Sequence, residues 1–150
     1  MSMMQLFYAA TRQNIVGSNV TTAMLLANNV QEAMANLTFN DPVTGRATFG
    51  AESGETTATQ FDDIDDFDGV TFSPPVDSLL NELPDVSRFA QVVSVVPVYT
   101  NKLNSNNGAT LEIPKSTYTG AARVTVRIVH VADEATTGEI FRTSWIRVDR

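Results

Sequence analysis

The chain has 150 residues, of which 43% are hydrophobic, and its formal net charge at pH 7 is -7. A chain of this length and apolar content can bury one ordinary core, so we expect a single domain that needs neither disulfides nor a structural metal. The absence of cysteine excludes a disulfide framework and a thiolate metal site. No run reaches the roughly 18 apolar residues of a membrane span, so we expect the chain as given to be soluble.

Charge is divided unevenly along the chain. Residues 1–85 hold 12 acidic and two basic residues, whereas residues 86–150 hold five acidic and eight basic ones. This balance argues against a nucleic-acid partner, because the basic residues are few and the acidic block would repel phosphates. We expect the acidic part to fold over the basic strands of the same domain.

The first predicted element is a long helix over residues 3–37. Its apolar residues recur at steps of three or four and so form one core-facing stripe. The stripe consists of Val16, Val20, Met24, Ala27, Val30, Met34 and Leu37. A continuous helix of this length would extend about 50 Å at about 1.5 Å per residue, so its front end should project beyond a small domain. Gly17 and the two polar residues after it favour a kink within the helix.

The loop region over residues 38–86 contains a dense acidic segment. Five aspartates are interleaved with Phe61, Ile64 and Phe67 at steps of three, which favours a turn anchored by its apolar residues. The aspartates are Asp62, Asp63, Asp65, Asp66 and Asp68. They are candidate calcium ligands, because calcium binds six to eight oxygens from flexible loops.

The register of this acidic segment does not fit an EF-hand. The first and twelfth positions of such a loop would be Ile64 and Pro75, so two essential ligands are missing. The segment also looks too polar to be buried, which argues against paired catalytic carboxylates. We therefore favour a solvated turn that pairs with strand arginines over a calcium site.

The second half of the chain predicts strands. Residues 89–99, 122–132 and 139–148 are expected to form an antiparallel sheet, with turns over residues 102–109 and 133–138. Val124, Val126, Ile128 and His130 should share the core face of the middle strand, and Phe141 and Trp145 a core face of the last one. Pro97 should lie at a bulge or an edge.

A short helix is also expected over residues 77–83, begun by Asp77 and ended by Pro84. The apolar face of the sheet needs a cover, and the N-terminal helix is the amphipathic helix available for it.

Catalytic chemistry is not indicated. His130 is the sole histidine, and no serine or lysine near it has a recognisable nucleophile context. A glycine-rich phosphate loop is also missing from the sequence. We therefore predict no catalytic residues, no small-molecule substrate and no cofactor. The alternative to the absence of a cofactor is bound calcium.

Three short blocks resemble a known family. They are ANNVQEAM at 27–34, ESGE at 52–55 and FDDIDDFDG at 61–69. In this order they are similar to bacterial type IV pilin-like proteins, above all to minor pilins of mannose-sensitive haemagglutinin pilus systems and to pseudopilins. The prepilin cleavage motif, the membrane half of the first helix and the C-terminal cysteine pair of many pilins are absent. The chain would then begin just after the membrane segment of a longer protein.

The resemblance implies an α+β fold in which a long N-terminal helix packs on an antiparallel sheet. One domain would span residues 1–150, with a helical stem over 1–37, an acidic loop region over 38–86 and the sheet over 87–150.

The resemblance also implies a function. The chain would be a structural subunit of a type IV pilus or a type II secretion-like filament, in the bacterial inner membrane, the periplasm or an extracellular filament. Its partners would be other pilin or pseudopilin subunits and, through the missing segment, the inner membrane. The apolar residues Met3, Met4, Leu6 and Phe7 would begin the subunit contact. The alternative is a secreted or periplasmic β-rich module that binds calcium or another ligand.

Overall fold

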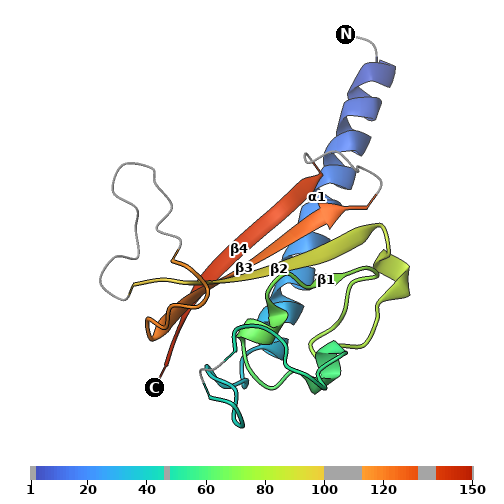
Figure 1. Ribbon diagram of the computed structural model, residues 1–150. Coiled ribbons are helices and arrows are strands. Elements are labelled where there is room, and N and C mark those ends of the chain that lie inside the picture. The colour runs from blue at the N-terminus through green and yellow to red at the C-terminus, as the bar shows by residue number, and fades with distance from the viewer. Residues whose placement is uncertain (1–2, 46–47, 100–112, 132–137, 150) are drawn as a thin grey trace.

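The computed structural model describes residues 3–45, 48–99, 113–131 and 138–149 (Figure 1). Of the side chains before Gly17, those of Met4, Gln5 and Gln13 are described. The described residues form a mixed α+β fold with one α-helix and a four-stranded antiparallel sheet. The predicted turn over 102–109 lies outside the described residues, as does the turn over 133–138 except for its last residue.

The sheet has the strand order β1-β2-β3-β4. The strands are β1 (Thr71–Phe72), β2 (Phe89–Pro97), β3 (Ala121–His130) and β4 (Glu139–Val148). The three strands predicted from alternation and β-branched composition are thus confirmed, and the last has the predicted bounds. Val124, Val126 and Ile128 are fully buried as the alternation requires, whereas His130 is only partly buried and stacks edge-on against Phe89.

Pro97 ends β2 at a local edge of the sheet. On one side β2 pairs with β3 as far as Pro97, but on the other side β1 pairs only with Gln91 and Val92. Because proline lacks a backbone N–H donor, this position avoids an interrupted ladder. The prediction for this residue is confirmed.

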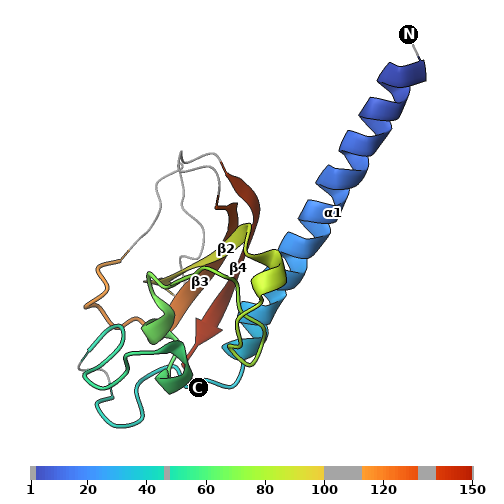
Figure 2. The same cartoon turned by 90° about the vertical axis from the view of Figure 1, so that its right-hand side faces the viewer.

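The helix α1 (Met3–Ala33) begins well away from the strands, and only its C-terminal part lies beside the sheet (Figure 2). That part contributes buried side chains to the same core as β2 and β3. The core members from this part of the chain are Ala23, Leu26, Ala27 and Val30 of the helix and Met34 just after it. The strand members include Val93, Val95, Val124, Val126 and Ile128.

The predicted core stripe of the N-terminal helix is correct from Ala27 onward and wrong at Val20 and Met24, whereas the side chain of Val16 lies outside the described part of the structure. Val20 is 37% exposed and Met24 is 47% exposed, whereas Ala23 is fully buried. Both Ala23 and Ala27 have small side chains, which let the helix backbone come close to the strands. The apolar pattern alone favoured the larger residues, but close approach favours the alanines.

The predicted kink at Gly17 is also wrong, because α1 is one continuous helix from Met3 to Ala33. A single glycine costs a helix only about 1 kcal/mol relative to alanine. The hydroxyl of Thr21 donates to the carbonyl of Gly17 at 3.0 Å, which adds a local bond at this point.

The predicted helix over residues 77–83 is replaced by a turn. The carboxylate of Asp77 accepts hydrogen bonds from the backbone N–H groups of Leu79 and Asn81 at 2.8 and 2.9 Å. Leu80 has a φ of 64°, which is incompatible with a right-handed helix. Aspartate can cap a turn as readily as a helix, so the capping signal was ambiguous.

Gln91 joins the helix, the sheet and the loop region. It is fully buried, and its side-chain amide donates to the carbonyls of Leu26 in α1 and Val76 in the loop at 2.8 and 3.0 Å. Its amide oxygen accepts from the backbone N–H of Val76 at 2.8 Å. All three elements therefore meet at one satisfied polar group in the core.

Arg147 of β4 binds the C-terminal end of α1. Its guanidinium donates to the carbonyls of Met34, Ala35 and Leu37 at 2.9, 3.2 and 2.7 Å. A cation at this end also interacts favourably with the helix dipole. These bonds cover carbonyls just beyond the end of α1, which ends at Ala33 and not at the predicted residue 37.

Substituting Arg147 by methionine should lower the free energy of unfolding by about 2 kcal/mol, because it removes charge-assisted hydrogen bonds and keeps the aliphatic stem. Urea unfolding followed by circular dichroism would measure the loss. The matched control is Arg142→Met, whose ion pair with Glu139 lies on the sheet surface and should contribute less than about 1 kcal/mol. Equal losses in the two variants would show that Arg147 does not stabilise the helix end.

Candidate functional site

The acidic segment predicted from sequence is partly buried, so the prediction of a solvated turn is wrong. Asp63 and Asp66 are only 2% and 3% exposed. Asp63 precedes the 3₁₀ helix η2 (Asp65–Phe67), and Asp66 lies within it. The apolar anchors Ile64 and Phe67 are each 1% exposed, as their spacing suggested. Because these anchors lie deep in the core, they draw the neighbouring carboxylates inward with them.

Backbone N–H groups compensate much of this burial. Asp63 Oδ1 accepts from the N–H groups of Asp65 and Asp66 at 2.9 and 3.3 Å. In return, Asp66 Oδ2 accepts from the N–H groups of Asp62 and Asp63 at 3.1 and 3.2 Å. The segment is therefore a turn closed by its own side chains.

Two further aspartates fasten the segment to its surroundings. Asp65 Oδ2 accepts from the backbone N–H of Gly50 at 2.8 Å, and Asp68 Oδ1 accepts from that of Val95 at 2.9 Å. The other oxygen of Asp68 forms an ion pair with Lys115. The predicted pairing with a strand arginine is thus wrong for Asp68.

The arginines of β3 and β4 have other partners. Arg127 and Arg142 both pair with Glu139, at 2.6 and 2.9 Å. Among these contacts, the ion pair that joins the acidic and basic parts of the chain is Asp68–Lys115, and Lys115 lies in the loop before β3 and not in a strand.

Two of the predicted metal ligands belong to a larger carboxylate cluster. Asp62 and Asp66 have carboxylate oxygens within 4.8 Å of one another and of Glu55, and Glu55 forms an equally close group with Asp41 and Glu52. We call these five residues the carboxylate cluster. The other predicted ligands, Asp63, Asp65 and Asp68, lie outside these two close groups. Sequence reasoning missed Asp41, Glu52 and Glu55, although Glu52 and Glu55 stand in the ESGE block.

Three oxygens of the carboxylate cluster are buried without a hydrogen-bond partner. They are Glu52 Oε2, Asp62 Oδ1 and Asp66 Oδ1. The second oxygen of Glu52 accepts from the hydroxyl of Thr44 at 3.1 Å. Buried polar atoms are normally satisfied, so three unpaired oxygens within one cluster require an explanation.

Burial and mutual repulsion disturb the ionisation of these groups. Burial raises the pKa of Asp66 to about 6. Burial also raises the pKa of Asp62, and the negative charges of Asp41 and Glu55 add to the effect. The pKa of Glu52 is likewise raised, mainly by burial. In contrast, the backbone N–H of Thr44 lowers the pKa of Asp41, which therefore stays ionised.

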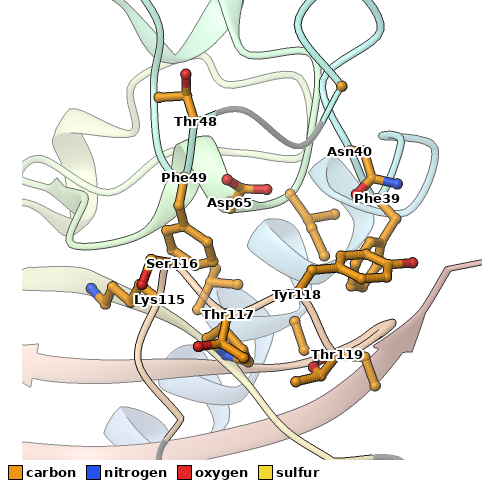
Figure 3. A pocket seen from close by; sticks show the side chains of 16 residues that line it. Phe39, Asn40, Thr48, Phe49, Asp65, Lys115, Ser116, Thr117, Tyr118 and Thr119 are labelled. Carbon is orange, nitrogen blue, oxygen red and sulfur yellow. Dashed lines mark hydrogen bonds between the residues drawn. The ribbon is translucent and has the colours of Figure 1, made fainter.

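A second feature is a cavity of about 230 Å³ beside the sheet (Figure 3). Phe39 and Tyr118 line one side, with their ring centroids 6.3 Å apart, and Phe49 and Lys115 line another. The volume is below the range of about 300–1,000 Å³ that is typical of small-molecule sites. Asp65 reaches its wall, but this carboxylate is already bound to Gly50. The cavity does not provide a catalytic arrangement.

A third feature is the exposed apolar surface of α1. Met4 is 82% exposed, Leu25 is 61% exposed, and Val20 and Met24 are also well exposed. Met4 is one of the four predicted contact residues. The side chains of the other three, Met3, Leu6 and Phe7, lie outside the described part of the structure.

The fold and its sites define a mixed α+β protein whose helix extends beyond the sheet and whose loop region carries buried carboxylates. Searches against protein-family models, curated proteins and solved structures found no match. Within the described residues, no helix is long and apolar enough to cross a membrane.

Proposed function

We propose that this chain is a structural subunit, a minor pilin or pseudopilin, of a type IV pilus or a type II secretion-like filament. The observation that carries the proposal is the exposed apolar surface on a helix that extends beyond its own domain (Figures 1 and 2). The role is one of assembly and not of catalysis.

The shape of the molecule supports a stem that serves other subunits. The helix α1 has 31 residues, whereas the first core position among its described side chains is Ala23. The residues before this point include the apolar block from Met3 to Ala10. A free-standing helix with such a block would expose apolar surface to water, and neighbouring helices can cover it.

The exposed side chains next to the domain support the same conclusion. Val20 and Met24 lie one turn apart, so they form a continuous apolar strip, with Leu25 beside it. A filament repeats one contact between two different patches, and such a contact is heterologous. We infer that this strip faces a neighbouring helix while the sheet faces outward.

The partners and location follow from this arrangement. The subunit would assemble with other pilin or pseudopilin subunits. In the full-length protein a preceding apolar segment would anchor it in the bacterial inner membrane before assembly into the filament. The long N-terminal helix would pack on the sheet only over its C-terminal part, in a pilin-like manner.

Cysteine cross-linking tests this proposal, because the chain has no cysteine of its own. In the full-length protein, expressed in the bacterium that encodes it, Leu25→Cys should form disulfide-linked species with cysteine-substituted pilin-like subunits in the filament fraction. The matched control is Glu82→Cys, which is also exposed but lies in the loop region, and it should cross-link at least about tenfold less. Isolation of the full-length protein only as a monomer without filament subunits would contradict the proposal.

A further inference from the structure

The geometry points to a calcium-binding site in the carboxylate cluster of Asp41, Glu52, Glu55, Asp62 and Asp66. The site joins three separate parts of the loop region and lies at the opposite end of α1 from the free stem. It does not depend on the filament function, since no residue of the projecting helix takes part.

The spacing of the oxygens fits a calcium ion. Each of the two close groups has its ligand atoms within 4.8 Å of one another. Calcium binds oxygens at about 2.4 Å, so ligands on opposite sides of one ion lie about 4.8 Å apart. Glu55 belongs to both groups and therefore brings them together.

Asp66 provides an independent observation that points to a ligand. The residue is only 3% exposed, and one of its oxygens, Oδ2, is held by two backbone N–H groups. The other oxygen, Oδ1, is buried without a partner. Since the backbone fixes the carboxylate, this second oxygen is presented to the cluster in a set orientation.

The other unpaired oxygens come from different segments. Asp62 Oδ1 and Glu52 Oε2 are also buried without a partner. A cation bound in the group of Glu55, Asp62 and Asp66 would satisfy the unpaired oxygens of Asp62 and Asp66 and would offset the repulsion between the carboxylates.

The chemistry of the ligands selects the ion. All five donors are carboxylates, and hard oxygen ligands favour calcium, magnesium or manganese over zinc or copper. Magnesium requires near-ideal octahedral geometry at about 2.1 Å, whereas calcium accepts irregular sets of six to eight oxygens. Ligands from an irregular loop therefore favour calcium.

Calorimetry on the metal-stripped chain tests the site directly. Titration with calcium chloride at pH 7.5 should give saturable binding with a Kd below about 100 μM, and magnesium chloride should bind at least about tenfold more weakly. The melting temperature should rise with calcium in step with occupancy. The absence of calcium binding at 10 mM, or equal binding of magnesium, would overturn the inference.

The variant Asp66→Asn separates metal binding from folding. Asparagine retains the oxygen that accepts from the backbone and removes the buried charge, so without metal the variant should melt at or above the temperature of the wild type. Its calcium affinity should fall at least about tenfold. Undiminished calcium binding by Asp66→Asn would overturn the assignment of the site.

Four control variants define where calcium binds and whether Arg46 is needed for binding. Glu82→Gln and Asp85→Asn remove exposed acids outside the cluster and should leave the calcium Kd unchanged within about twofold. Arg46→Gln should also retain binding, and loss of binding in this variant would contradict the site as drawn. Leu25→Glu should bind calcium normally even if it blocks assembly, so the site and the filament function can fail separately.

Discussion

Replacing Val30 by aspartate should lower the free energy of unfolding by about 4 kcal/mol or more, because the new carboxylate would be buried without a partner. Val30 is fully buried where α1 meets the strands. The loss combines the removal of an apolar side chain with the desolvation of a charge. Urea unfolding followed by circular dichroism would measure it. If the variant does not fold, Val30→Ala should still show a loss of about 2 kcal/mol.

The matched control for this substitution is Met24→Asp. Met24 lies on the same helix but is 47% exposed, so an aspartate there should change the free energy of unfolding by no more than about 0.5 kcal/mol. A large loss of unfolding free energy at Met24 would mean that the helix packs on the sheet through the apolar stripe predicted from the sequence. A small loss at Val30 would mean that α1 is not part of the core.

The stability of the metal-free chain should fall as the pH rises from about 4 to about 8. Burial raises the pKa of Asp66 to about 6, and burial together with the charges of Asp65 and Asp66 raises that of Asp63 to about 8. In the unfolded chain an aspartate has a pKa of about 4. The folded chain therefore binds more protons in this window, and it loses stability as each group is forced to ionise.

For Asp66 alone the difference corresponds to about 3 kcal/mol between pH 4 and pH 7, since one pKa unit is about 1.4 kcal/mol. Urea unfolding of metal-stripped protein across this range would measure the fall. The variant Asp63→Asn keeps an oxygen for the N–H groups of Asp65 and Asp66 but cannot ionise, so its stability should decline less between pH 6 and pH 8. Constant or rising stability of the wild type over the same range would contradict burial of these carboxylates.

The strands of this protein could be predicted because their signal is local. Alternation of apolar and polar residues has a period of two, and it identified β3 and β4 with nearly their observed bounds. The long helix was also predictable, apart from its last turn and the continuity through Gly17. The carbonyls just beyond the end of that helix bind Arg147, which is more than a hundred residues away in the chain. No local pattern contains that partner.

The face that α1 turns to the sheet could be predicted only in part. From Ala27 onward the apolar stripe and the buried side chains coincide. Before Ala27, either Val20 and Met24 or Ala23 could face the sheet. The small side chain of Ala23 allows the helix to approach the strands more closely. Packing density decides between the two sets, and it depends on the strands opposite as well as on the helix.

By itself the sequence determined the mixed α+β class, the strand positions and the presence of an acidic segment anchored by Ile64 and Phe67. Only the tertiary structure decided that Asp63 and Asp66 are buried, and that Asp41, Glu52 and Glu55 stand beside Asp62 and Asp66. The physical reason is the range of the interactions. Periodicity records how each residue relates to its neighbours in the chain, whereas burial and charge clusters depend on segments that meet only after the core has formed.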